Sequence, residues 1–188
     1  MDDVSRRDFI AWAMKSTCFL SLLTSGNLFP LERKWLAFAE EPNLKRSLSK
    51  EVMFYKKLDS RMVECGICFR RCQVAESDRG FCGNKENRGG KYYLLVYGKV
   101  CAAHLDPIEK KPLFHYLPGT TAFSIAAAGC NLQCKFCQNW EISQSRPEDI
   151  AHSPLSPQQA VAVAKQNDSP TIAYTYSEPT VFYTYMYV

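Results

Sequence analysis

Three cysteines stand close together in the second half of the chain, at Cys130, Cys134 and Cys137. Thiolates are soft ligands that suit zinc and iron–sulfur clusters, and a closed site of either kind takes four protein ligands. Three thiols leave such a site one ligand short, so that one metal can stay open for another molecule. The spacing therefore favours an open, catalytic site, in which this triad (Cys130, Cys134 and Cys137) can hold three irons of a [4Fe–4S] cluster and leave the fourth iron free.

A second group of cysteines lies nearer the N-terminus and supplies four thiols within eighteen residues: Cys65, Cys68, Cys72 and Cys82. Four thiolates suit zinc or a closed iron–sulfur cluster. The surrounding segment has few apolar residues, so a bound metal would supply part of its folding free energy. Structural thiols, or a disulfide formed after export, are the alternative. We predict a second, closed metal site here, and zinc and a second iron–sulfur cluster both remain open as its occupant.

The triad carries the first of two resemblances to known proteins. Its Cys-x3-Cys-x2-Cys spacing, with Phe136 just before the third cysteine, resembles the radical S-adenosylmethionine (SAM) superfamily. The resemblance implies that SAM binds the open iron, and that an electron from the cluster cleaves it to a 5′-deoxyadenosyl radical. Tyr176-Ser177-Glu178-Pro179 resembles the Gly-Gly-Glu-like motif of that superfamily, although Tyr176 and Ser177 replace the glycines.

This likeness also implies roles for individual side chains. Phe136, Ser177 and Glu178 are expected to contact the cofactor, with Glu178 accepting a hydrogen bond from the amino group of SAM. An ordinary acid beside a helix N-terminus is the alternative for Glu178. No catalytic residue beyond the cluster ligands is expected.

A closer resemblance includes the segment Asp106-Pro107-Ile108-Glu109-Lys110-Lys111-Pro112-Leu113, together with His115 and Pro118-Gly119. With the triad and the Glu178 motif, these blocks resemble the AmmeMemoRadiSam-system radical SAM enzymes, relatives of the pyruvate formate-lyase activating enzymes. The likeness covers residues 60–188 and implies an oxidoreductase-like enzyme of the activating type, with a cytosolic electron donor. It leaves a protein substrate open and does not name the substrate. The alternative is an exported metal-binding or electron-transfer module without SAM chemistry.

The elements that would position these residues can be read from the apolar pattern. Residues 121–128 are apolar and lie between Gly119 and Gly129, which predicts a buried strand. Ser156-Pro157 predicts the start of a helix that ends near Gln166. A second strand is expected over 171–176, and Pro179 would begin a second helix.

These elements predict an α/β fold with five parts. A signal over 1–39 and a linker or short helix over 40–62 precede the cysteine-rich metal module at 63–90. A β-hairpin and loop follow at 91–120, with its turn at Gly98, and 121–188 would begin a radical SAM (β/α) barrel. A complete eight-unit barrel needs about 250 residues. We therefore expect a C-terminally truncated sequence, whose barrel is incomplete and which is inactive on its own.

The N-terminus resembles an export signal. Arg6-Arg7 precedes an apolar run that leads to Ala37-Phe38-Ala39, which predicts twin-arginine export; a cytoplasmic protein with an N-terminal amphipathic helix is the alternative. Lys15 within the run argues against a stable membrane span, because a central lysine costs about 3 kcal/mol on insertion scales. The formal net charge of +4 over 188 residues is too small to favour a nucleic-acid partner.

Overall fold

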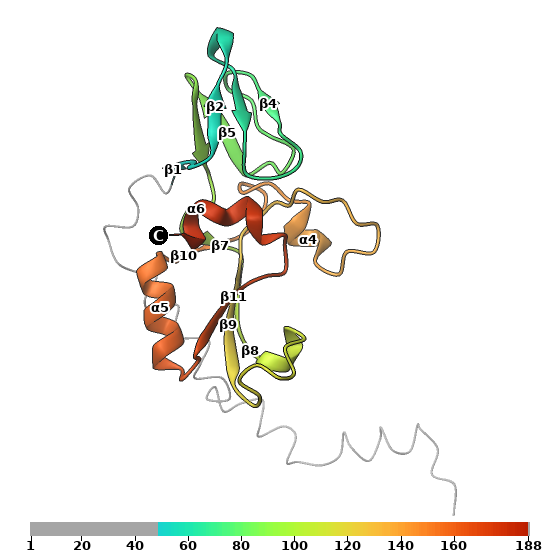
Figure 1. The fold of residues 1–188 in the computed structure, drawn as a ribbon, viewed down its shortest axis with the longest axis vertical. Coiled ribbons are helices and arrows are strands. Elements are labelled where there is room, and N and C mark those ends of the chain that lie inside the picture. Colours follow the sequence, from blue (N-terminus) through green and yellow to red (C-terminus); the bar gives the residue numbers. More distant parts are fainter. Residues whose placement is uncertain (1–48, 188) are drawn as a thin grey trace, which may run out of the picture. The chain divides into compact units, whose positions relative to one another are not determined.

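The computed structural model describes residues 49–187 (Figure 1). The predicted signal over 1–39, with Cys18, and the start of the predicted linker lie outside these residues. Within them the strands are β1 (Lys50–Glu51), β2 (Tyr55–Lys57), β3 (Val63–Cys65), β4 (Gln73–Val74), β5 (Lys85–Arg88), β6 (Lys91–Leu94), β7 (Lys99–Val100), β8 (Ala102–Pro107), β9 (Thr121–Ala126), β10 (Ser153–Pro154) and β11 (Thr171–Tyr174). The α-helices are α4 (Trp140–Ser143), α5 (Pro157–Gln166) and α6 (Tyr183–Met186), and 3-10 helices cover Asp59–Arg61, Ile108–Lys110 and Pro179–Phe182.

The strands form four small sheets, and most of their pairings are antiparallel. Their strand orders are β1-β6-β5, β2-β3-β4, β10-β7 and β11-β9-β8. Only β9 and β11 pair in parallel among the described strands, with Thr171 opposite Ala122 and Tyr174 opposite Ile125. The helix α5 connects these two strands and contacts both.

The prediction that 121–188 begins a (β/α) barrel is wrong. In such a barrel every strand has a parallel neighbour on each side. Here β8 lies antiparallel along one edge of β9 from Ala102 to Pro107, so that β9 has a parallel partner on its other edge alone. The described chain is built from small, mainly antiparallel sheets with short helices.

The predicted hairpin over 91–120 is also wrong, although its turn exists. Gly98 has a positive φ of 68°, and the Lys99 amide donates to the carbonyl of Val96 at 3.0 Å. The strands on either side do not pair with each other: β6 pairs with β1 and β5, whereas β7 pairs with β10. Where a linker or short helix was expected over 40–62, the described residues form β1, which pairs with β6, and β2, which pairs with β3, followed by the 3-10 helix Asp59–Arg61.

Three of the predicted elements are confirmed. The buried strand is β9, and the second strand is β11. The helix α5 begins after Ser156, whose hydroxyl accepts from the Gln159 amide, while the Gln159 side chain accepts from the Ser156 amide. Such reciprocal capping, with Pro157 in the first turn, explains why this helix begins where the sequence predicts.

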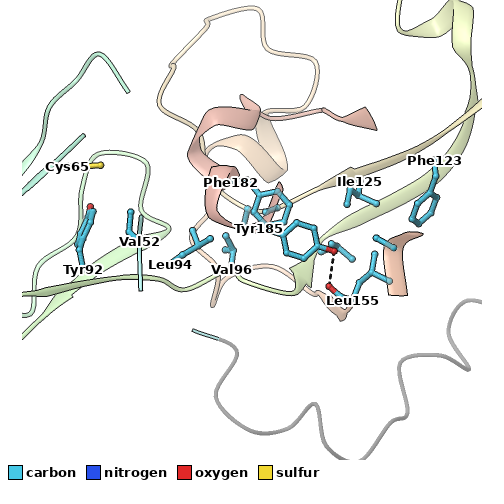
Figure 2. Close-up of a cluster of buried hydrophobic side chains, with 14 of the residues drawn as sticks. Val52, Cys65, Tyr92, Leu94, Val96, Phe123, Ile125, Leu155, Phe182 and Tyr185 are labelled. Atoms are coloured by element: carbon cyan, nitrogen blue, oxygen red, sulfur yellow. Dashed lines mark hydrogen bonds between the residues drawn. The ribbon is translucent and has the colours of Figure 1, made fainter. Parts of the chain in front are cut away.

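The core is a continuous cluster of buried apolar side chains drawn from the cysteine-rich segment, β6, β9, α5 and the last helices (Figure 2). Ile125 of β9 and Val63 of β3 are both fully buried. Full burial of such a side chain contributes about 1.5–3 kcal/mol. Phe182 and Tyr185 stack with ring centroids 4.4 Å apart, and the Tyr185 hydroxyl donates to the carbonyl of Leu155 at 3.0 Å.

One prediction about membranes can be compared with the described part of the chain. No helix within residues 49–187 is long and apolar enough to cross a bilayer.

Candidate functional site

The loops that carry the triad and Glu178 leave the sheet at the same edge. Because β9 and β11 run in parallel, their carboxyl ends lie together, and in α/β sheets ligands bind outside such ends. The pairing continues past the strands, since the Thr175 amide donates to the carbonyl of Ile125 at 3.0 Å. Two residues further along each segment, the Ser177 hydroxyl donates to the carbonyl of Ala127 at 3.0 Å. The two segments that the sequence assigned to one site are therefore adjacent.

The three thiols of the triad lie in a loop without regular structure between β9 and α4. Cys130 is buried, and its Sγ accepts from the Leu132 amide at 3.4 Å. Cys137 is half-buried, with its Sγ 3.4 Å from the Ser143 hydroxyl, whereas Cys134 is exposed. An amide hydrogen bond onto sulfur stabilises a thiolate, which is the form that binds metal.

Gly129 explains how this loop begins. Its φ is +91°, a conformation that residues with a side chain rarely adopt, and a Cβ here would lie 2.3 Å from the carbonyl oxygen of Cys82. Only glycine lets the backbone of the triad loop pack this closely against the cysteine-rich segment. The Asn84 side chain adds a hydrogen bond of 3.2 Å to the carbonyl of Ala128.

One cysteine from each of the two groups consequently lines the same cavity. This cavity has a volume of about 440 Å³, and its lining includes Cys82 from the first group and Cys130 from the triad. Arg79 closes one side, where it forms ion pairs with Glu148 at 2.7 Å and Glu86 at 3.1 Å. The two cysteine groups are far apart in the sequence, and the fold brings Cys82 next to the triad loop.

Glu178 lies between β11 and the 3-10 helix that starts at Pro179. It is half-buried, and one of its carboxylate oxygens accepts from the Thr180 hydroxyl. Glu178 is the N-cap residue of this helix, although its side chain makes no capping hydrogen bond, so its position is compatible with both interpretations of this acid. Ser177 is anchored to Ala127 as described above, and Phe136 is 92% exposed.

An ionic network holds the segment before Glu178, and it involves residues to which the sequence assigned no role. The carboxylate of Asp106, on β8, has a side chain only 6% exposed. It accepts from Lys110 at 2.8 Å, from Lys111 at 2.5 Å and from the Tyr176 hydroxyl at 2.5 Å. Burial alone would raise the pKa of Asp106, but these donors outweigh it and hold that pKa well below its usual range.

The same network fixes an unusual backbone conformation. Tyr176 has a φ of +66°, in the left-handed region that costs a tyrosine about 1–3 kcal/mol. Burial raises the pKa of Tyr176, and its hydrogen bond to Asp106 raises it further, so its hydroxyl stays protonated and donates. The side-chain contact with Asp106 therefore stabilises the turn that leads into Ser177 and Glu178. The sequence signal for this network was Asp106 followed closely by Lys110 and Lys111, and that signal alone does not identify Tyr176 as a partner of Asp106.

The first cysteine group is gathered at one end of the β2-β3-β4 sheet. Cys65 ends β3, and its amide donates to the carbonyl of Cys72 at 2.9 Å. Burial raises the pKa of the Cys65 thiol, and the nearby Cys82 and Cys68 raise it further. All eight described cysteines are free thiols, so the disulfide alternative is not formed here. Cys101, outside both groups, is half-buried, and burial raises its pKa to about 11.

The two cysteine groups fit a metal by their ligand type, whereas their side chains do not stand in the geometry of a bound metal. Within residues 49–187, no three His, Cys, Asp or Glu side chains already stand in the arrangement of a metal site. The donor sets nevertheless fit, because each group consists of soft sulfur ligands on neighbouring segments. The thiols must turn toward a common centre when a metal binds.

Comparison with known proteins gives two relatives, both from Methanocaldococcus jannaschii. The uncharacterized protein MJ0808 is 51% identical over 138 residues, which are 73% of this chain and 41% of that protein. The uncharacterized protein MJ0674 is 41% identical over 81 residues, which are 43% of this chain and 19% of that protein. This chain thus spans less than half the length of either relative. No family model matches the chain, and no solved structure matches it.

Proposed function

We propose that the protein is a radical SAM enzyme of the activating type, whose triad holds a [4Fe–4S] cluster. One observation carries the proposal: the parallel pairing of β9 and β11 sets the triad loop and the Glu178 segment at the same strand ends. Three thiols beside a half-buried carboxylate suit a cluster with one open iron and a cofactor that carries an amino group. When bound, such a cluster supplies the electron that cleaves the sulfonium of SAM.

The residues of this chain would bind and orient the two groups. Cys130, Cys134 and Cys137 would ligate iron, and the Leu132 amide, already 3.4 Å from the Cys130 sulfur, would stabilise the bound thiolate. Glu178 would accept a hydrogen bond from the amino group of SAM. Ser177 would act through its hydroxyl bond to Ala127, which keeps Glu178 at the strand ends.

Phe136 has a different place in this proposal. Phe136 is 92% exposed next to Cys137 in the sequence, so that its ring is free to contact the cofactor, as the resemblance implies. An electron donor and a substrate, for which a protein remains open, would approach from the exposed side of the triad loop. Export through the twin-arginine pathway, which carries folded proteins, remains part of the proposal.

The test uses the full-length protein with its cluster reconstituted under anaerobic conditions. We expect dithionite and SAM to give 5′-deoxyadenosine, measured by liquid chromatography and mass spectrometry. Cys134→Ala should abolish this product, because the triad would keep two ligands. Cys101→Ala is the matched control, since Cys101 is a half-buried thiol between β7 and β8 and belongs to neither cysteine group. Product formation by Cys134→Ala at the level of the control would refute the proposal and favour a metal-binding module without SAM chemistry.

A further inference from the structure

The first cysteine group contains features that the proposed function does not use. Its four thiols come from β3, from the turn after it and from the loop before β5. Cys65 and Cys72 lie across the backbone pairing of β3 with the segment before β4, and Cys68 lies in the turn between them. Cys82, in the loop before β5, lies near Cys65.

A buried tyrosine hydroxyl points into this group. Tyr92 is fully buried, and its hydroxyl has no hydrogen-bond partner within the described structure. Figure 2 shows its hydroxyl end directed toward Cys65. The thiols of Cys65, Cys72 and Cys82 lie near this hydroxyl, and so does the backbone of Gly80. Since a backbone N–H cannot accept the hydroxyl proton, a sulfur of this group is an available acceptor for it.

The tyrosine and a thiol also share one narrow space. A Cβ on Gly80 would lie 2.6 Å from the Tyr92 hydroxyl and 3.7 Å from the sulfur of Cys72. Glycine at this position keeps the space between hydroxyl and thiol free. A buried hydroxyl left without an acceptor costs about 1–3 kcal/mol, and a metal-bound sulfur in this space would supply the acceptor.

A buried lysine also contacts this cysteine group. Lys85 is only 2% exposed, and its ammonium donates to Val181 O at 2.7 Å, to Asn84 Oδ1 at 3.0 Å and to Cys82 Sγ at 3.6 Å. None of these partners is a carboxylate, and Lys85 takes part in no ion pair between described side chains. In the structure the Cys82 thiol donates to Asn84 Oδ1 at 3.1 Å. As a metal-bound thiolate, the same sulfur would give Lys85 the counter-charge that a buried ammonium otherwise lacks.

We propose that Cys65, Cys68, Cys72 and Cys82 bind one Zn²⁺ in a closed, structural site. Lys85 would donate to the sulfur of Cys82, and Tyr92 would donate to a sulfur of the same group. Four thiolates and one Zn²⁺ leave two negative charges, one of which the Lys85 ammonium offsets. Since the described thiols do not yet stand in ligand geometry, binding must turn them toward the ion, which couples metal binding to folding of this segment.

The first experiment measures zinc in a form of the protein that cannot hold the triad cluster. In a Cys130→Ser/Cys134→Ser/Cys137→Ser variant of the full-length protein, we expect about one zinc per chain by plasma mass spectrometry. Adding Cys65→Ser or Cys82→Ser should remove it, whereas adding Cys101→Ser should not. Zinc that stays after Cys65→Ser, or that is missing from the parent variant, would overturn the site. These results do not depend on SAM chemistry, so the site can fail while the proposed function stands.

A second measurement covers the case in which a cysteine variant does not fold. Co²⁺ exchanged into the parent variant should give the intense visible bands and thiolate-to-metal charge-transfer absorption of a four-sulfur tetrahedral site. A pale octahedral spectrum would overturn the ligand set, and disulfides among these four cysteines in peptide mass spectra would overturn it as well.

The roles of Tyr92 and Lys85 have their own test. Loss of a hydrogen bond to a metal ligand typically weakens metal binding about 10–100-fold. We expect Tyr92→Phe and Lys85→Met each to weaken zinc binding to this extent in competition with a chelator. The matched controls are Tyr93→Phe and Lys91→Met, because both residues lie on β6 and are less buried than Tyr92 and Lys85. Equal affinities in variants and controls would overturn these two assignments.

Discussion

Asp106→Asn should destabilise the protein strongly, although Asp106 belongs to neither cysteine group. Its carboxylate is 6% exposed and accepts from three donors. Hydrogen bonds to a charged group contribute about 1.5–3 kcal/mol each, and exposed pairs contribute less than about 1 kcal/mol. Lys110 is 61% exposed and belongs to the second kind, whereas Lys111 is only 11% exposed.

The expected cost follows from what asparagine leaves behind. The amide oxygen of the asparagine can still accept one hydrogen bond, but the ammonium group of Lys111, whose side chain is only 11% exposed, loses its counter-charge. We therefore expect the free energy of unfolding at pH 7 to fall by about 3 kcal/mol, near the lower end for breaking a buried ion pair. Glu76→Gln is the matched control, because the Arg61–Glu76 pair is 70% and 44% exposed and should change stability by less than about 0.5 kcal/mol.

The pH dependence gives the sign of the effect. The pKa of Asp106 is lowered in the folded state, and an unfolded aspartate has a pKa of about 3.9. The stabilisation is therefore complete above about pH 5 and is lost as the pH falls below the unfolded value. Urea unfolding followed by tryptophan fluorescence should show a gap between wild type and Asp106→Asn that narrows from pH 7 to pH 3. A gap below 0.5 kcal/mol at pH 7, or one that widens in acid, would refute this reasoning.

Four further predictions test other parts of the structure. Gly129→Ala should cost about 3 kcal/mol or more in urea unfolding, because its Cβ would clash with the Cys82 carbonyl and its φ is positive; a change below 1 kcal/mol would contradict that close approach. Tyr185→Phe should cost about 1 kcal/mol by the same assay, through the lost bond to Leu155, and an unchanged midpoint would mean that this bond contributes nothing. Glu178→Gln should weaken SAM binding to the reconstituted full-length protein about 10–100-fold in equilibrium dialysis, with the exposed Glu141→Gln as control; equal affinities would remove Glu178 from the cofactor site. Arg6→Lys/Arg7→Lys should stop export of a reporter fused to the N-terminal 45 residues, and continued export would exclude the twin-arginine pathway.

Local patterns were sufficient to predict individual elements. The strand β9 follows from an apolar run between two glycines, and α5 follows from Ser156-Pro157 with its reciprocal cap. Both signals depend on residues close together in the sequence, so they do not depend on how the rest of the chain folds.

Strand pairing could not be predicted in the same way. Gly98 does make a turn, but the residues after it pair with β9 and β10, because tertiary contacts decide which edges meet. A strand–helix–strand pattern looks the same whether its neighbours are parallel or antiparallel. The barrel prediction failed at this step, since β8 occupies the edge of β9 that a barrel would give to a parallel strand.

The candidate site was predictable only in part. Cysteine spacing identified both thiol groups, and the likeness of Tyr176-Ser177-Glu178-Pro179 to a Gly-Gly-Glu-like motif identified the segment around Glu178, because each signal lies within a short stretch of sequence. The partners that depend on distant segments were missed: Asp106 with Tyr176, Lys85 with Cys82 and Val181, and the close approach of Gly129 to Cys82. Each joins positions whose proximity depends on the fold, apart from the three-residue step between Cys82 and Lys85.

The most direct test of the central claim is the electron paramagnetic resonance spectrum of the reconstituted, dithionite-reduced full-length protein with and without SAM. If three thiols leave one iron open and SAM binds it, the signal of the reduced triad cluster must change when SAM is added. The same change should be absent from the Cys130→Ser/Cys134→Ser/Cys137→Ser variant. A reduced cluster in the wild type whose spectrum stays the same at saturating SAM would contradict the account.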